Sequence, residues 1–256
     1  MQHEFSRTEL LIGNAGLEKL RTSTVIIFGV GGVGSYTVEA LARAAVGHLI
    51  LVDFDEISIT NLNRQIHSLH STMGEAKVEV MKRRILEINP KARVETIREF
   101  YSATNSDRFL DRNLDYVVDA IDTVSSKVIL AKECLHRKIP LISSMGAGNR
   151  LTAENYKVSD ISKTSGDPLA KAMRKLLRKE GITTGVKVVY SPDLPLTPLS
   201  AQAESNNDCT SPNPNIDSGG IEKRQVPGSI SFVPSVVGLL IAGEVVRDLL
   251  QTADER

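Results

Sequence analysis

Short apolar runs alternate with amphipathic segments over the first 150 residues of the chain. The runs at 24–29 and 48–55 are rich in β-branched residues and lack the polar alternation of a half-exposed strand, so both predict fully buried strands. Three further strands are predicted at 93–100, 114–122 and 139–148, and helices at 35–46, 75–89 and 125–137. Strands that alternate with helices in this way are typical of an α/β fold, here a Rossmann-like, doubly wound, mainly parallel sheet.

The second half of the chain has a different pattern. Asp167, Pro168 and Gly181 stand where the N-cap, first turn and stop of a helix are expected, which predicts a helix between them. The segment 191–228 holds six of the ten prolines, so it predicts a long irregular stretch. A last helix is expected at about 234–250.

This change of pattern divides the chain into two parts. A length of 256 residues suits one large α/β unit with a well-buried core. Residues 1–150 form the expected core, and residues 151–256 form an extension that continues the sheet and is left for substrate binding.

Charge and cysteine content narrow the class of protein. The 31 Lys and Arg balance the 31 Asp and Glu, so the whole-molecule charge favours no polyanionic partner, although a local basic patch remains open. The two cysteines, Cys134 and Cys209, form no CxxC pair, which excludes a disulfide framework and a four-thiolate zinc site. The chain starts without an apolar signal segment, and the run at 230–243 is too short for a membrane span, so we expect a cytoplasmic protein.

A glycine-rich loop follows the first predicted strand. Gly29, Gly31, Gly32 and Gly34 allow a tight turn and leave the amides of the next helix free for a phosphate. Asp53, at the end of the second strand, is placed to accept hydrogen bonds from ribose hydroxyls. These residues predict an adenine nucleotide, and an NAD-dependent dehydrogenase satisfies them equally well.

The residues beyond Asp53 favour cleavage of a triphosphate over hydride transfer. Asn61, Arg64 and Lys77 supply an amide and two cations, which neutralise charge on the α-phosphate and departing pyrophosphate. Asp119 and Asp122 end the fourth strand and are candidate ligands of Mg²⁺. The alternatives are surface solvation for Arg64 and Lys77 and strand capping for Asp119, so Asp122 is the stronger metal candidate.

The motifs GVGGVG, DFDEISITNLNRQ, MGEAK and DAID together resemble the family of ubiquitin-activating-enzyme-like adenylyltransferases, which includes the molybdopterin and thiamine sulphur-carrier activators. The resemblance covers residues 5–150. It implies that ATP binds at the glycine loop with its ribose at Asp53. The other nucleotide-binding positions are Asp55, Asn61, Arg64, Gln65 and Lys77.

The resemblance also implies a metal and a second copy of the chain. Asp122 would hold Mg²⁺ near the attacked α-phosphate. Arg7 matches the position of an N-terminal arginine that reaches the ATP of the partner in a homodimer, and its alternative is a solvated arginine at a helix start.

The sequence departs from the sulphur-carrier activators in its thiols. Those proteins commonly carry paired CxxC zinc ligands, and some use a downstream catalytic cysteine. Cys134 falls on a predicted helix, where a buried apolar role is expected, and Cys209 has no histidine nearby in sequence to activate it. A thiol intermediate therefore has weak support.

The predicted helix after Pro168 carries a basic stripe. Lys171, Arg174, Lys175 and Arg178 fall at i, i+3, i+4 and i+7, opposite an apolar face. A solvated surface is the ordinary explanation of such a stripe. In a chain of zero net charge, it also favours binding of a phosphate backbone.

Residues 158–174 and the closing GSISFVPSVVGLLIAGEVV are similar to one branch of the family, the tRNA threonylcarbamoyladenosine dehydratases. This similarity implies ATP-dependent activation of the threonine carboxylate on N6-threonylcarbamoyladenosine in tRNA. The side chain then closes into a ring and AMP and pyrophosphate are released. An intramolecular nucleophile needs no enzyme cysteine.

The implied partners are tRNA carrying threonylcarbamoyladenosine, a second copy of the chain, and a helper protein of the sulphur-acceptor or desulphurase type. One alternative is an adenylating activator of a ubiquitin-like or sulphur-carrier protein. Another is a non-catalytic nucleotide-binding or RNA-binding module, against which Arg64, Lys77 and Asp122 argue.

Overall fold

A single seven-stranded sheet organises the molecule. The computed structural model describes residues 2–199 and 227–254, and its strands lie in the order β3-β2-β1-β4-β5-β7-β6. All neighbouring pairs are parallel except β6 and β7, which are antiparallel. The strands are β1 (Thr24–Phe28), β2 (His48–Val52), β3 (Arg93–Ile97), β4 (Tyr116–Asp119), β5 (Leu141–Ser144), β6 (Lys157–Asp160) and β7 (Lys187–Tyr190).

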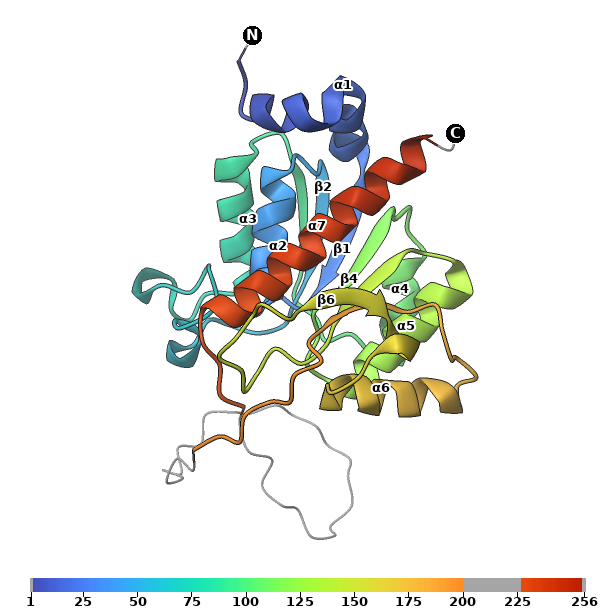
Figure 1. Ribbon diagram of the computed structural model, residues 1–256. Coiled ribbons are helices and arrows are strands. Elements are labelled where there is room, and N and C mark those ends of the chain that lie inside the picture. The colour runs from blue at the N-terminus through green and yellow to red at the C-terminus, as the bar shows by residue number, and fades with distance from the viewer. Residues whose placement is uncertain (1, 200–226, 255–256) are drawn as a thin grey trace.

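Helices cover both faces of this sheet (Figure 1). On one face α2, α3 and α7 pack together, and on the other face lie α4, α5 and α6. The helices are α1 (Ser6–Thr22), α2 (Gly34–Arg43), α3 (Lys77–Ile88), α4 (Ser106–Leu110), α5 (Val124–Arg137), α6 (Pro168–Lys179) and α7 (Phe232–Asp254). Among the helices of the described residues, none combines the length and apolarity of a membrane span.

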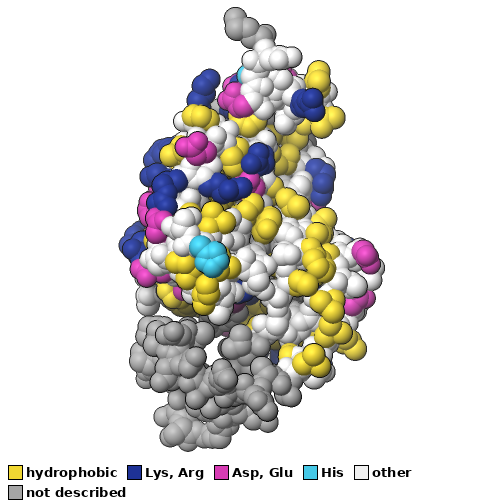
Figure 2. Space-filling view, turned by 90° about the vertical axis from the view of Figure 1, so that its left-hand side faces the viewer, with side chains coloured by type: hydrophobic (Ala, Val, Ile, Leu, Met, Phe, Trp, Pro, Cys, Tyr) yellow, Lys and Arg dark blue, Asp and Glu magenta, His cyan; other side chains and the backbone are white. Residues whose placement is uncertain are grey.

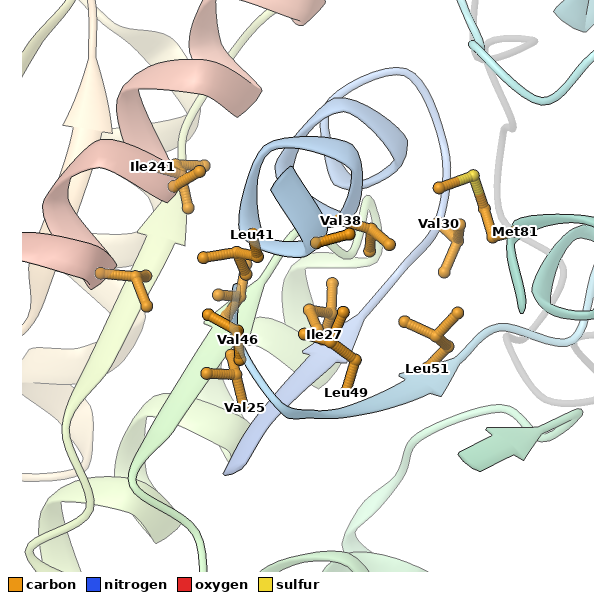
Figure 3. Close-up of a cluster of buried hydrophobic side chains, with 14 of the residues drawn as sticks. Val25, Ile27, Val30, Val38, Leu41, Val46, Leu49, Leu51, Met81 and Ile241 are labelled. Carbon is orange, nitrogen blue, oxygen red and sulfur yellow. The ribbon is translucent and has the colours of Figure 1, made fainter. Parts of the chain in front are cut away.

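The central strands are buried on both faces, as their unbroken apolar sequences predict. Val25 and Ile27 point to one face, and Ile26 and Phe28 point to the other, because successive side chains of a strand alternate. Figure 3 shows the first of these clusters, where side chains of β1 and β2 meet those of α2, α3 and α7. This two-sided burial fixes β1 at the centre of the sheet.

The glycine loop requires glycine for steric reasons at its end. A Cβ on Gly34 would lie 1.9 Å from the carbonyl oxygen of Gly29, so any side chain there would force α2 away from the strand. This close approach sets the start of α2 directly against the end of β1.

Helix α7 crosses α2 at a similarly close contact. A Cβ on Gly238 would lie 2.4 Å from the carbonyl oxygen of Val33, and Thr37 donates its hydroxyl to the carbonyl of Gly238 (3.1 Å). At the far end of α7, Asp248 accepts hydrogen bonds from the hydroxyl of Tyr116 (2.6 Å) and from Lys187 (2.7 Å). The last helix thus joins the glycine loop, β4 and β7.

The predicted fold class is confirmed, and so are the five strands and the helices predicted from the pattern. The expectation that the extension after residue 150 continues the sheet is confirmed by β7 and β6, which lie beyond β5, although the positions of these two strands were not predicted. Residues 191–199 and 227–228 contain no helix or strand, and the rest of the predicted irregular segment, with Cys209, lies outside the described residues. The division at residue 150 stays a prediction.

The loop between β2 and α3 folds back on itself and encloses a histidine. Two backbone hydrogen bonds close the loop: the N–H of Ile57 donates to the carbonyl of Glu75 (2.9 Å), and the N–H of Gly74 donates to the carbonyl of Ile57 (2.9 Å). His67 is 2% exposed, and neither of its ring nitrogens has a hydrogen-bond partner in the structure. Burial, with smaller contributions from the charges of Lys77 and Arg84, lowers the pKa of His67 to about 3.

His67 makes the folded state sensitive to acid. The unfolded chain binds a proton at this histidine below a pKa of about 6.5, whereas the folded chain excludes it down to about 3. Stability from this group is therefore complete above about pH 6.5 and is lost as the pH falls, by roughly 1.4 kcal/mol per pH unit. Urea unfolding at about pH 7 and about pH 5 measures this slope.

The pH dependence of stability is compared with that of the variant His67→Gln, whose side chain cannot take up the proton. We expect the variant to lose less stability over the same pH interval, by roughly one proton's worth of slope, whatever its stability at neutral pH. Equal slopes in the two proteins would show that His67 has an ordinary pKa in the folded state.

Candidate functional site

The residues predicted for the nucleotide and the metal gather at one edge of the sheet, where β1, β2 and β4 end. This edge is also the point at which the strand order reverses between β1 and β4, the usual position of a ligand in such a sheet. Backbone bonds hold the three strand ends together: Gly29 donates to Val52 (2.8 Å), and Ala120 donates to Phe28 (2.8 Å). The glycine loop, the residues that follow β2 and the acids that follow β4 therefore start from one edge of the sheet.

Asp53 organises the glycine loop. Its carboxylate accepts the backbone N–H of Val30 (2.6 Å) through one oxygen and that of Asp55 (2.9 Å) through the other. Burial raises the pKa of Asp53, and the charge of Lys77 and these two backbone bonds oppose that rise. The residue predicted for the ribose thus also fixes the loop beside it.

Arg64 and Gln65 lie over the glycine loop. The Cγ of Arg64 is 3.4 Å from where a Cβ of Gly32 would stand, and the amide nitrogen of Gln65 is 3.9 Å from the same point on Gly31. The Nη1 atom of Arg64 donates to the carbonyl of Thr60 (2.8 Å) and to a side-chain oxygen of the neighbouring asparagine (3.0 Å).

The remaining Nε and Nη2 atoms of Arg64 have no partner in the described part of the chain. They form the edge of the guanidinium that offers two parallel N–H groups to an oxyanion.

Lys77 and Asn61 complete the polar side of this loop. Lys77 is buried at the start of α3, and its ammonium is 2.7 Å from a carboxylate oxygen of Asp55. Asn61 accepts the backbone N–H of Ser58 through its side-chain oxygen (3.1 Å), so its amide nitrogen remains the available donor. Two cations and several N–H donors therefore face one edge, an arrangement suited to a polyanion.

The two acids after β4 have different environments. Asp119 is fully buried, 3.0 Å from the ammonium of Lys127, and it accepts a hydroxyl from Ser143 (2.6 Å). Asp122 is exposed, and it accepts a hydrogen bond from the hydroxyl of Thr123 (3.3 Å). The geometry assigns Asp119 to the structure of the strand end and leaves Asp122 open to a cation.

Arg7 and Cys134 lie away from this edge. Arg7 is exposed on α1, which precedes β1 and therefore lies at the opposite end of the sheet (Figure 1). Cys134 lies on the buried face of α5, and burial raises the pKa of its thiol to about 12. Its expected apolar role agrees with this placement, and its thiol is not activated.

The basic stripe lies on α6 as predicted. Asp167 caps this helix by accepting the N–H of Ala170 (2.9 Å), while Met173 and Leu177 are buried against α5 and the sheet. Four stripe residues line a surface hollow of about 540 Å³: Lys171, Arg174, Lys175 and Arg178. Within residues 2–199 and 227–254 none of these four has an ion-pair partner, and Arg174 donates a hydrogen bond to the hydroxyl of Thr164.

Three residues of this region were missed by the sequence reasoning. Asn63 stands inside the quoted motif without an assigned role, and Asn149 and Arg150 directly follow the fifth predicted strand, 139–148. Asn63 contacts Arg64, and Arg150 is buried 3.5 Å from Asp167. An asparagine next to an arginine in a specific motif was the signal available.

Comparisons with known proteins show the family of the chain. The ThiF family pattern matches residues 5–256. The tRNA threonylcarbamoyladenosine dehydratase of Bacillus subtilis is 49% identical over 253 residues, which cover 98% of this chain and 96% of the relative. The Escherichia coli protein of the same name is 37% identical over 206 residues, 78% of this chain and 77% of the relative.

Solved structures agree as well. The Escherichia coli tRNA N6-threonylcarbamoyladenosine dehydratase TcdA in complex with ATP superposes with a TM-score of 0.86 at 31% identity, covering 99% of this chain and 96% of that one. Its complex with AMP gives the same values. Because the family pattern spans the chain from residue 5 to its last residue, and the loop, the cations and the acid of the motif meet at one sheet edge, the chain belongs to the ThiF family.

Proposed function

We propose that this chain binds ATP at the glycine loop and dehydrates N6-threonylcarbamoyladenosine in tRNA. The observation that carries the proposal is the free Nε and Nη2 edge of Arg64 over the glycine loop, at the same sheet edge as Lys77 and Asp122. Identity of 49% with a dehydratase over 98% of the chain supports the choice of substrate.

The proposed reaction has two steps. A carboxylate oxygen of the threonyl group attacks the α-phosphorus of ATP, and the bond to pyrophosphate breaks. A nucleophilic N–H or O–H group of the same side chain then attacks the acyl carbon and loses its proton, which closes the ring, and the bond from the acyl carbon to the AMP oxygen breaks. Arg64 and Lys77 stabilise the negative charge that builds in the first step. Proximity drives the second step, which agrees with the buried, unactivated Cys134.

Asp122 fits a magnesium ion. It is an exposed carboxylate without a cation partner in the described part of the chain, and Mg²⁺ is usually bound by one or two carboxylates together with phosphate oxygens. The bound ion would neutralise phosphate charge beside Arg64.

The substrate is tested by incubating the chain with tRNA carrying threonylcarbamoyladenosine, ATP and Mg²⁺, followed by mass spectrometry of the nucleosides. We expect loss of one water from threonylcarbamoyladenosine and one AMP per product. Arg64→Ala and Asp122→Ala should each slow AMP formation by about a hundredfold or more, because each removes charge stabilisation in the transition state. Chelation of Mg²⁺ should do the same.

Arg83→Ala is the matched control, because Arg83 is exposed on α3 and paired with Glu75 outside the site. AMP formation with a small protein ending in Gly-Gly, and none with tRNA, would replace the proposal by activation of a carrier protein. Full activity of Arg64→Ala would contradict the proposal that adenylation takes place at this site.

We further propose that α6 binds the phosphate backbone of tRNA. Lys171, Lys175 and Arg178 of its stripe are exposed, and Arg174 is half-buried. None of the four has an ion-pair partner in the described part of the chain, whereas Arg43 of α2, Arg84 of α3 and Arg137 of α5 pair with acids. The N-cap of α6 also contacts the loop after β5, since Gly146 donates its N–H to Asp167 (3.1 Å). A backbone bound along α6 would therefore lie next to the edge that holds ATP.

Charge reversal measures this contribution. We expect Lys171→Glu with Arg178→Glu to weaken tRNA binding by about tenfold or more and to reduce the salt slope by roughly two, while ATP affinity stays unchanged. Lys91→Glu with Lys138→Glu is the control, because it changes the net charge equally at exposed lysines before β3 and β5. Equal loss of tRNA affinity in both double variants would show that the loss follows from the change in net charge and not from contacts of α6 with tRNA.

We also propose a homodimer in which Arg7 completes the site of the partner. Within one chain Arg7 lies at the end of the sheet opposite the glycine loop, so it can act only on another copy. Leu10 and Leu11 on the same helix are 85% and 87% exposed, and Phe232 and Leu239 of α7 are exposed as well. Figure 2 shows hydrophobic side chains exposed on this side of the molecule, as a self-associating surface requires.

Complementation tests the sharing of sites. Arg7→Ala and Arg64→Ala homodimers should each be inactive, whereas a random mixture of both chains should recover about a quarter of the activity, because half of the dimers hold one intact site. Size-exclusion chromatography checks that dimers form. Recovery near zero, with mixed dimers present, would show that Arg7 acts within its own chain, and full activity of Arg7→Ala alone would show that it has no role in the reaction.

The helper protein and the cytoplasmic location stay predictions.

A further inference from the structure

Arg64 is held on one side by an asparagine whose own amide is held from behind. The side-chain oxygen of Asn63 accepts from Nη1 of Arg64 (3.0 Å), and its side-chain nitrogen donates to the carbonyl of Ser229 (2.9 Å). An amide whose oxygen and nitrogen have separate partners loses both bonds when it flips. The carbonyl of Ser229 therefore sets the direction in which Asn63 presents its oxygen to Arg64.

The position of Ser229 is fixed by Asn149. The N–H of Gly228 donates to the side-chain oxygen of Asn149 (2.6 Å), and the N–H of Asn149 donates back to the carbonyl of Gly228 (2.7 Å). Asn149 adopts a left-handed conformation (φ 56°), which asparagine tolerates better than most residues. Its carbonyl also accepts the N–H of Leu196 (2.7 Å). Asn149 is thus the common anchor of two distant parts of the chain.

The loop that carries Asn149 is itself rigidly attached. Arg150 is buried and donates to the carbonyls of Gly146 (3.2 Å) and Asp193 (2.7 Å). Its guanidinium also lies 3.5 Å from the buried carboxylate of Asp167. Nη1 of Arg64 thus has two acceptors, the local carbonyl of Thr60 and the side chain of Asn63, and the second is tied by a continuous series of bonds to the loop after β5.

We propose that Asn63 and Asn149 are positioning residues for Arg64. They hold Nη1 on the protein, so that the Nε and Nη2 edge faces the phosphates of ATP before the nucleotide arrives. A donor fixed in advance loses less entropy on binding and stabilises charge without reorganisation. The inference rests on the proposed function only in taking Arg64 as a phosphate ligand.

A double-mutant cycle on ATP affinity tests this role in the full chain without tRNA. Asn149→Gly keeps the left-handed backbone and removes the side-chain oxygen, and Asn149→Asp keeps both. We expect Asn149→Gly to raise the Kd for ATP by about tenfold, and Asn149→Asp to change it by less than about twofold. In an Arg64→Ala background, Asn149→Gly should change the Kd by less than about twofold, because the residue acts through Arg64.

The same increase in both backgrounds would overturn the proposal, since Asn149 would then support the fold of the site without Arg64. No increase in the original background would overturn it too. Thermal unfolding monitors folding, and if Asn149→Gly does not fold, Asn63→Ala at an exposed position carries the same cycle. Asn113→Ala is the matched control, an exposed asparagine before β4 without a hydrogen-bond partner among the described residues.

This test is separate from that of the proposed function. If ATP affinity follows the cycle and tRNA nucleosides are unchanged, the positioning role stands and the substrate is wrong. If tRNA is dehydrated and the cycle is additive, the function stands and the positioning role is wrong.

Discussion

The buried carboxylate of Asp53 joins the ends of the two central strands. By accepting the N–H of Val30 it fixes the glycine loop after β1 to the end of β2, and by accepting the N–H of Asp55 it turns the chain toward Lys77. A buried carboxylate is costly unless its oxygens are satisfied, and here backbone donors satisfy both. The positions of the glycine-loop amides and of Lys77 depend on this one group.

The same strand edge shows how environment separates two acids of one type. Asp119 and Asp122 are three residues apart in the sequence. Asp119 is buried and paired with Lys127 and Ser143, whereas the side chain of Asp122 is exposed to solvent. Removing Lys127 would leave a buried charge without a partner, which costs several kcal/mol. Asp122 has no such constraint and keeps its charge for an incoming cation.

Sequence reasoning succeeded where the determinants are local. The glycine loop, Asp53 and the motif around Arg64 are continuous in sequence, and apolar runs of the central strands reflect burial on both faces. It predicted that the second half continues the sheet but did not locate β6 and β7, because four-residue strands such as Lys157–Asp160 carry little periodicity and owe their pairing to a neighbour. It missed the role of Asn149 because the bond to Gly228 joins residues 79 positions apart. No local pattern encodes such a contact.

The unpaired cations of α6 give a neutral molecule a directional field. The 31 positive and 31 negative formal charges cancel, so the molecule has no net charge that attracts a polyanion at long range. Attraction arises only when the positive end of its electric dipole, at α6, turns toward the polyanion. Bulk nucleic acid would therefore hold this protein weakly in most orientations. Productive encounters would be selected by orientation, so a molecule with no net charge can approach RNA without being retained on every strand that it meets.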